Sequence, residues 1–215
     1  MDQPDIRGKA EEAVKTIRGN YERMQESGRL LFLNYDPEKL CRRLSITPVP
    51  EGIPLRYLGE MHLVRLPDGE VLDSAGKKAS PTTALTIYDV LCRSETTPFL
   101  RGRFVPTMEL HGIMGSNSVH ENLNEKEAAF FSGRGEELAE ACRRRGGTPG
   151  GRGDVSFRLP VFDFFPVELR FWEADEEFPA QLQFFWDAGA LDFLHYETLW
   201  YVMGDLTARL RRELG

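Results

Sequence analysis

Acidic side chains are concentrated near the carboxyl end of the chain, between two tryptophans. Four carboxylates lie within the five residues from Glu173 to Glu177, and Trp172 and Trp186 stand on either side of them. Carboxylate oxygens are the ligands that Mg²⁺ and Ca²⁺ prefer, and an aromatic wall beside them favours a small-molecule site. The spacing matches no EF-hand loop, and charge runs usually serve solubility. A solvated turn, with Phe178 tucked back onto the core, is therefore the competing interpretation.

His195 is the second feature that could carry chemistry. It is followed closely by Glu197 and preceded by Asp187 and Asp192, and a histidine near carboxylates can act as a base near neutral pH. None of the four histidines, which include His62, His111 and His120, has another histidine or a cysteine at metal-ligand spacing. We assign no catalytic set and no metal site. The candidate ligand-binding residues are Trp172, Asp175, Glu176, Glu177, Trp186 and His195.

A third candidate is the segment 143–154, which is rich in glycine and arginine. Glycine amides together with arginines can bind phosphate. Neither nucleotide-binding fingerprint, GxGxxG or GxxxxGK[ST], is present in it. Arginines also complement the negative carboxyl end of a helix, and we favour this structural interpretation. The sequence also lacks the GxSxG nucleophile motif and the HExxH metal motif.

The composition indicates a chain with a sizeable core and little attraction for polyanions. Its 215 residues are 41% hydrophobic and 28% charged, with a net charge of −7. We therefore expect no nucleic-acid and no membrane partner, and no run of about 18 apolar residues could span a bilayer. Cys41, Cys92 and Cys142 are far apart and odd in number. That usage is typical of a reducing compartment, so we expect a cytoplasmic protein.

The elements that position these residues can be read from periodicity. In the amino-terminal part, apolar residues recur every three or four positions from Ile6 to Met24, which predicts an amphipathic helix ending at Gly28. Asp36-Pro37 and Ser80-Pro81 are typical starts of two further helices. Between them, residues 53–72 have the pattern of short strands, with Pro67-Asp68-Gly69 as a hairpin turn.

Strand periodicity returns in the last third of the chain. Residues 155–159, 167–172 and 182–186 are predicted strands, and the last two would form an antiparallel hairpin around the acidic segment. Helices are predicted at 124–131, 135–145 and 197–214. This order predicts an α+β fold, a twisted antiparallel sheet with helices packed mainly on one side. We expect residues 1–28 to be an N-terminal helix that extends a single α+β domain at 29–215.

The same third of the chain resembles a known family. The pairs Leu159-Pro160 and Phe165-Pro166, the run 169–180 with its Asp-Glu-Glu-Phe-Pro-Ala sequence, and Phe185-Trp186-Asp187 are similar to the family called domain of unknown function 3786. This family occurs in bacteria and archaea, mainly anaerobes. With Asp36-Pro37-Glu38 and the hairpin at 67–71, the resemblance covers residues 30–212.

The sequence also departs from the family pattern. Ala174 stands where the family has glycine, and His195-Tyr196-Glu197-Thr198 replaces its usual lead-in to the last helix. The resemblance implies no established activity. Some relatives join this domain to an iron–sulfur-cluster domain of the kind used in corrinoid-linked one-carbon metabolism. The present chain lacks cluster cysteines, so such a link would require a separate protein.

Three functions are compatible with these observations. The leading hypothesis is a cytoplasmic binding or accessory module for a protein or small-molecule partner, linked to anaerobic corrinoid or iron–sulfur metabolism, with its cofactor left open. The second is a metal-assisted enzyme that uses Asp175, Glu176 or Glu177 with a histidine such as His195. The third is a structural subunit that associates with itself, as a homodimer, through exposed aromatic side chains.

Overall fold

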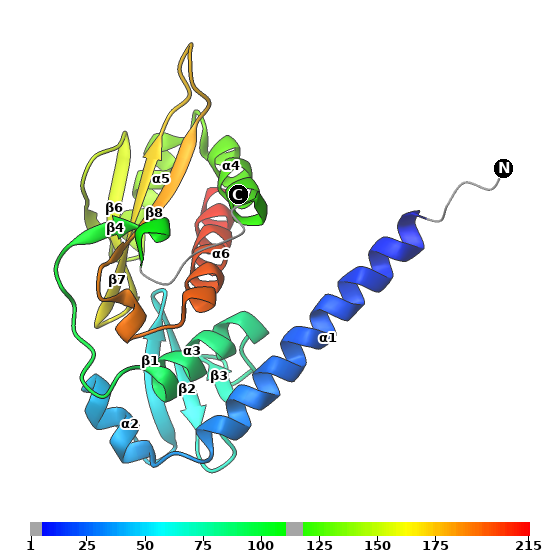
Figure 1. Ribbon diagram of the computed structural model, residues 1–215, viewed down its shortest axis with the longest axis vertical. Coiled ribbons are helices and arrows are strands. Elements are labelled where there is room, and N and C mark those ends of the chain that lie inside the picture. The colour runs from blue at the N-terminus through cyan, green and yellow to red at the C-terminus, as the bar shows by residue number, and fades with distance from the viewer. Residues whose placement is uncertain (1–5, 111–117) are drawn as a thin grey trace.

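A single antiparallel sheet of eight strands organises the molecule in the computed structural model, which describes residues 6–110 and 118–215 (Figure 1). The strand order is β3-β2-β1-β6-β7-β8-β4, and β5 pairs with β6 off this path. The bounds of the strands are β1 Gly52–Tyr57, β2 Glu60–Arg65, β3 Val71–Asp73, β4 Phe104–Pro106, β5 Thr148–Pro149, β6 Val155–Phe162, β7 Phe165–Trp172 and β8 Gln181–Asp187. The antiparallel α+β prediction is confirmed.

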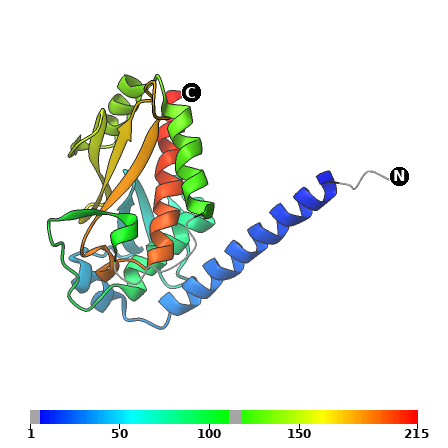
Figure 2. The ribbon, with the colours of Figure 1, turned by 45° about the horizontal axis from the view of Figure 1, so that its top comes forward.

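The described helices are distributed along the whole chain. Helices α4 and α6 lie along the same face of β7 and β8 (Figure 2). None of the helices in the described part is long and apolar enough to cross a membrane. Their bounds are α1 Ile6–Phe32, α2 Pro37–Leu44, α3 Pro81–Arg93, α4 Ser118–Phe131, α5 Gly135–Arg144 and α6 Tyr196–Leu214.

The core is built from alternating residues of the three central strands. Phe157, Leu169 and Phe184 stand opposite one another on β6, β7 and β8, and all three are buried. Side chains of one strand alternate between the two faces of a sheet, so the residues two positions along each strand lie on this same face. The two rows that they form are also buried. These rows are Val155–Phe171–Leu182 and Leu159–Val167–Trp186.

The predicted helix starts are confirmed by their caps. The Asp36 carboxylate accepts the backbone N–H of Glu38 at 3.0 Å, and the Ser80 hydroxyl accepts that of Thr83 at 3.2 Å. Each bond satisfies one of the unpaired donors of a first helical turn. The hairpin turn at Pro67-Asp68-Gly69 is also confirmed, since it connects β2 to β3.

The prediction that the first helix ends at Gly28 is wrong. Helix α1 continues to Phe32, which is only 1% exposed and belongs to the core. A Cβ at Gly28 would lie 2.8 Å from Cδ2 of Tyr88. The glycine therefore serves the close approach of α1 to α3 and does not stop the helix. From this anchored end, α1 runs outward, and its amino-terminal half projects away from the body (Figures 1 and 2).

Candidate functional site

The acidic segment forms a turn at the far end of the β7–β8 hairpin (Figure 1). Oδ1 of Asp175 accepts the backbone N–H groups of Phe178 at 2.7 Å and Glu177 at 2.8 Å, and these bonds lower the pKa of its carboxyl group. Glu176 and Glu177 are exposed. Phe178 is 58% exposed, so the expectation that it tucks back onto the core is wrong. The turn is a solvated loop stabilised by its own aspartate.

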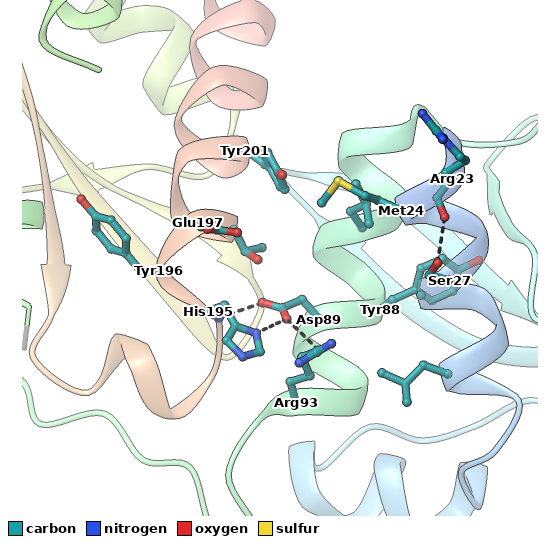
Figure 3. A pocket seen from close by; sticks show the side chains of 14 residues that line it. Arg23, Met24, Ser27, Tyr88, Asp89, Arg93, His195, Tyr196, Glu197 and Tyr201 are labelled. Carbon is teal, nitrogen blue, oxygen red and sulfur yellow. Dashed lines mark hydrogen bonds and ion pairs between the residues drawn. The ribbon is translucent and has the colours of Figure 1, made fainter. Parts of the chain in front are cut away.

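The other predicted site residues, two tryptophans and His195, do not gather at this turn. Trp172 ends β7 beside the turn and is half-buried. Trp186 is fully buried, and its Nε1 donates to Oγ1 of Thr107 at 3.1 Å. His195 lies beside α3, at the beginning of α6 and away from the hairpin tip (Figures 1 and 3). The structure thus does not bring the six candidates together.

The described residues contain no group of three or more histidines, cysteines and acidic residues arranged to hold a metal ion. His62 is buried, its Nδ1 lies 3.0 Å from the Glu60 carbonyl oxygen, and burial lowers its pKa. His111 lies outside the described residues. His120 is in α4, but its side chain lies outside the part that is described.

The carboxylates that precede His195 in sequence have other partners. Asp187 accepts the backbone N–H groups of Arg101, Gly102 and Gly189 at 2.6–2.8 Å. Asp192 forms an ion pair with Arg101 at 3.3 Å. These bonds fix the loop before β4 against the end of β8, which is a structural role.

The glycine- and arginine-rich segment also has a structural role. The backbone N–H of Gly151 donates to Glu168 at 3.1 Å, and Gly150 N–H donates to the Ser156 carbonyl oxygen at 2.9 Å. Arg143 and Arg144, at the end of α5, pair with Glu140 one turn earlier. These glycine amides are therefore already used within the protein.

A cleft of about 850 Å³, referred to below simply as the cleft, lies between α1, α3 and α6 (Figure 3). Its wall on the α1 side includes Met24 and Leu31, and α3 adds Leu85. Charged and polar side chains from all three helices line the remainder, namely Arg23, Asp89, Arg93, His195, Glu197 and Tyr201.

Asp89 and His195 form the tightest polar contact in the cleft. Oδ1 of Asp89 lies 2.6 Å from Nδ1 of the His195 ring, and Oδ2 accepts the backbone N–H of His195 at 2.8 Å. The Asp89 side chain is 8% exposed, whereas the His195 side chain is 54% exposed. Arg93, one turn further along α3, has its Nε 3.9 Å from Oδ1 of Asp89. The buried carboxylate of Asp89 thus stands between two half-exposed groups, His195 and Arg93 (Figure 3).

This contact fixes the protonation pattern of the ring. An ionised carboxylate only accepts hydrogen bonds, so the Nδ1 atom that faces Asp89 carries the proton. Nε2 of the neutral ring is then the lone-pair nitrogen, and it points away from Asp89. The same carboxylate caps α6 from another helix, because His195 is the residue before α6 and its own side chain makes no capping bond.

Tyrosines close the cleft beside this pair. Tyr201 contacts Tyr21 of α1 edge-on, with ring centroids 5.8 Å apart, and burial raises the pKa of its hydroxyl. Tyr88 donates its hydroxyl to the Gly69 carbonyl oxygen at 2.7 Å, so this group is turned away from a ligand. Tyr201 is thus the tyrosine whose hydroxyl faces the cleft (Figure 3).

Sequence reasoning singled out His195 but missed Asp89. The two residues are 106 positions apart, and none of the carboxylates near His195 in sequence is its partner. One signal was present: Asp89 is four residues after Leu85 and three before Cys92, on the apolar face of its helix. Because carboxylates are rarely buried unless they are paired, an acidic residue at such a position indicates a partner elsewhere in the fold.

Comparison with known proteins gives one result. No curated protein and no solved structure is significantly similar to this chain. The model of the family described as domain of unknown function (DUF3786) matches residues 36–209, a range that includes Asp89, His195 and the whole sheet but excludes α1. Because this match covers most of the 215 residues, the chain belongs to the DUF3786 family.

Proposed function

We propose that this protein is a binding module that holds a small molecule in the cleft. The cleft itself carries the proposal, because its volume of about 850 Å³ falls within the range of about 300–1,000 Å³ typical of small-molecule sites. Such sites combine apolar walls with a few convergent polar groups. Met24, Leu31 and Leu85 provide the walls, and His195 and Tyr201 are among the polar groups.

The positions of the acidic residues favour the cleft over the acidic turn as the ligand site. A metal-assisted reaction that uses Asp175 together with His195 would need both at one point, and they lie in different parts of the fold (Figure 1). One carboxylate oxygen of Asp175 also accepts two backbone hydrogen bonds within its own turn. The exposed Glu176 and Glu177 remain a suitable surface for a basic protein partner.

Self-association is the second candidate function, and one observation favours it. Leu30, Leu33 and Tyr35, at the end of α1 and directly after it, expose 37–50% of their surface. Grouped apolar side chains of this kind are typical of protein interfaces. In this case, light scattering of the full chain would give a mass that rises with concentration above the 24.5 kDa of one chain.

We also propose a cytoplasmic location and a link to corrinoid or iron–sulfur metabolism that operates through a partner protein. Cys41, Cys92 and Cys142 are free, buried and located on three different helices. Burial raises the pKa of Cys92 and of Cys142 to about 12, which disfavours the thiolate form that binds iron. The cluster in such a link would therefore belong to the partner.

A thermal-shift screen of the full chain tests the binding proposal. The probes are MgCl₂, MnCl₂, hydroxocobalamin, haemin and ATP, each compared with buffer. A compound that binds the native state at about 100 times its Kd adds about 2.7 kcal/mol to the free energy of unfolding. We expect at least one probe to raise the Tm of the wild type.

Two variants locate the binding. Ser27→Trp places an indole in the cleft, whereas Leu30→Trp places it on a 50% exposed outer position of the same helix. The shift should disappear in Ser27→Trp and persist in Leu30→Trp. An equal shift in both variants, or no shift with any probe, contradicts the proposal.

A further inference from the structure

The cleft contains more than a binding surface, because its histidine is oriented by a buried carboxylate. We propose that His195 is a general base: Nε2 accepts a proton from water or from a ligand hydroxyl in the cleft, and Asp89 stabilises the imidazolium that results. This inference rests on the proposed function, since the reacting molecule must enter the same cleft.

The first support is the rigidity of the pair. Oδ2 of Asp89 is held by the backbone N–H of His195, so the carboxylate cannot rotate away from the ring, and Oδ1 stays 2.6 Å from Nδ1. A base whose second nitrogen is held by a third group is the arrangement that activates water or hydroxyl nucleophiles in enzymes. Asp89 selects the tautomer with a bare Nε2, which is the form that accepts a proton.

The second support is the exposure of the ring. The His195 side chain is 54% exposed on the cleft, and Nε2 has no hydrogen-bond partner in the described part of the chain. Arg93 lies next to the pair with a side chain that is also 54% exposed. Its Nε lies 3.9 Å from Oδ1 of Asp89, so a positive charge stands beside the carboxylate that holds the ring.

A purely structural role accounts for only half of the contact. Capping of α6 requires the backbone N–H of residue 195 and Oδ2 of Asp89, and any residue type supplies that N–H. The ring and its bond to Oδ1 add nothing to this cap. Replacement of the His195 ring therefore removes the base but leaves the cap of α6 intact.

The reaction can be written for a simple activated ester, p-nitrophenyl acetate. An O–H bond of water breaks, its proton goes to Nε2, and the oxygen electron pair forms a bond to the acetyl carbon while the C=O π pair moves onto the carbonyl oxygen. That pair then re-forms the C=O bond as the C–O bond to nitrophenol breaks, and the electron pair of the broken bond leaves on nitrophenolate. The imidazolium and the acetic acid each lose one proton to solvent, so acetate and nitrophenolate are the products and no further reactant is needed.

The test compares hydrolysis of p-nitrophenyl acetate by the full-length wild type, His195→Gln and Lys39→Gln. Lys39 is an exposed residue of α2 and controls for reaction of the ester with surface groups. We expect His195→Gln to lower the rate by about 10²-fold, the lower end of what a positioned base contributes, whereas Lys39→Gln leaves it within about twofold. A His195→Gln rate within about twofold of the wild type overturns the proposal.

The solvent isotope effect supplies a readout that a structural histidine would not change. The wild-type rate should fall in D₂O, because an O–H bond breaks in the step. No isotope effect indicates direct attack by the ring and contradicts the base role.

Two further measurements separate the possible failures. If the probes of the thermal-shift screen still stabilise His195→Gln while hydrolysis equals that of the wild type, the base is wrong and the binding proposal stands. If His195→Gln does not fold, ¹H–¹⁵N spectra of the wild type show which ring nitrogen of His195 carries the proton. A proton on Nε2 and a bare Nδ1 at neutral pH would exclude the role.

Discussion

At the scale of single residues, Glu168 shows how this fold accommodates a charge inside the sheet. It lies in the middle of β7, on the face opposite to the core rows, and is 0% exposed. Burial alone would raise the pKa of its carboxyl group. Hydrogen bonds from Arg158 at 2.7 Å, Arg170 at 2.6 Å and Gly151 N–H at 3.1 Å outweigh this effect and hold the pKa below the ordinary value of a glutamate.

We expect Glu168→Gln to lower the free energy of unfolding at pH 7 by about 2 kcal/mol, because two arginines lose a charged acceptor. Since the folded pKa of Glu168 is depressed, its contribution is present above the unfolded pKa and is lost as the pH falls through the folded value. The difference between the two proteins should therefore shrink as the pH falls below the ordinary pKa of a glutamate.

Urea unfolding at pH 7 and at acid pH measures this difference, and Glu176→Gln in the exposed turn is the matched control. The control should lie within about 0.5 kcal/mol of the wild type at both pH values. A gap between Glu168→Gln and the wild type that stays constant into acid would show that the charge of Glu168 does not contribute.

At the scale of elements, the contact of α1 with α3 determines whether the cleft has its third wall. The two helices approach closely at Gly28, where an added Cβ would lie 2.8 Å from Cδ2 of Tyr88. This ring cannot move aside easily, because its hydroxyl is bound to the Gly69 carbonyl oxygen on the turn after β2. Gly19, nine residues earlier on α1, has nothing within 4 Å of an added Cβ.

These two glycines provide a matched pair of substitutions. Gly28→Ala should reduce the free energy of unfolding by about 1–3 kcal/mol, because its methyl group would overlap the Tyr88 ring. Gly19→Ala should increase helix stability by up to about 1 kcal/mol, because alanine is the better helix former. Thermal unfolding of both variants measures the contrast, and stabilisation by Gly28→Ala would mean that α1 does not pack on α3 as described.

At the scale of the whole molecule, two groups of strands are joined by a narrow connection. Strands β1 and β6 pair through a single residue pair, Tyr57 and Phe162, and Tyr57 is also hydrogen-bonded to α6. Asp205 of α6 accepts the hydroxyl groups of Tyr57 at 3.1 Å, Thr82 at 2.9 Å and Thr83 at 3.1 Å. One carboxylate thus joins α6 to β1 and to the first turn of α3.

Loss of this carboxylate should weaken the whole fold. We expect Asp205→Ala to lower the free energy of unfolding by about 2–3 kcal/mol, because three hydroxyl groups lose their acceptor. Thr82→Ala, which removes one of the three bonds, should cost about 1 kcal/mol. Equal costs for the two variants in urea unfolding would argue against a shared acceptor.

Features that depend only on neighbouring residues could be predicted from the sequence. The caps at Asp36 and Ser80, the turn at 67–69 and the alternation of the central strands follow from local hydrogen bonding and from side-chain period, so they could be predicted without knowledge of the fold. His195 could be singled out for the same reason, as an ionisable residue among nearby carboxylates.

Which of these residues come into contact depends on the packing of the whole fold. Asp89 pairs with His195, which is 106 positions away in the sequence. Gly28 allows the Tyr88 ring to pack against α1, and Glu168 accepts hydrogen bonds from two arginines on one face of the sheet. The acidic turn, the most conspicuous pattern in the sequence, points into solvent instead. Contacts between distant residues depend on how helices and strands pack against each other, and that packing is a property of the whole core.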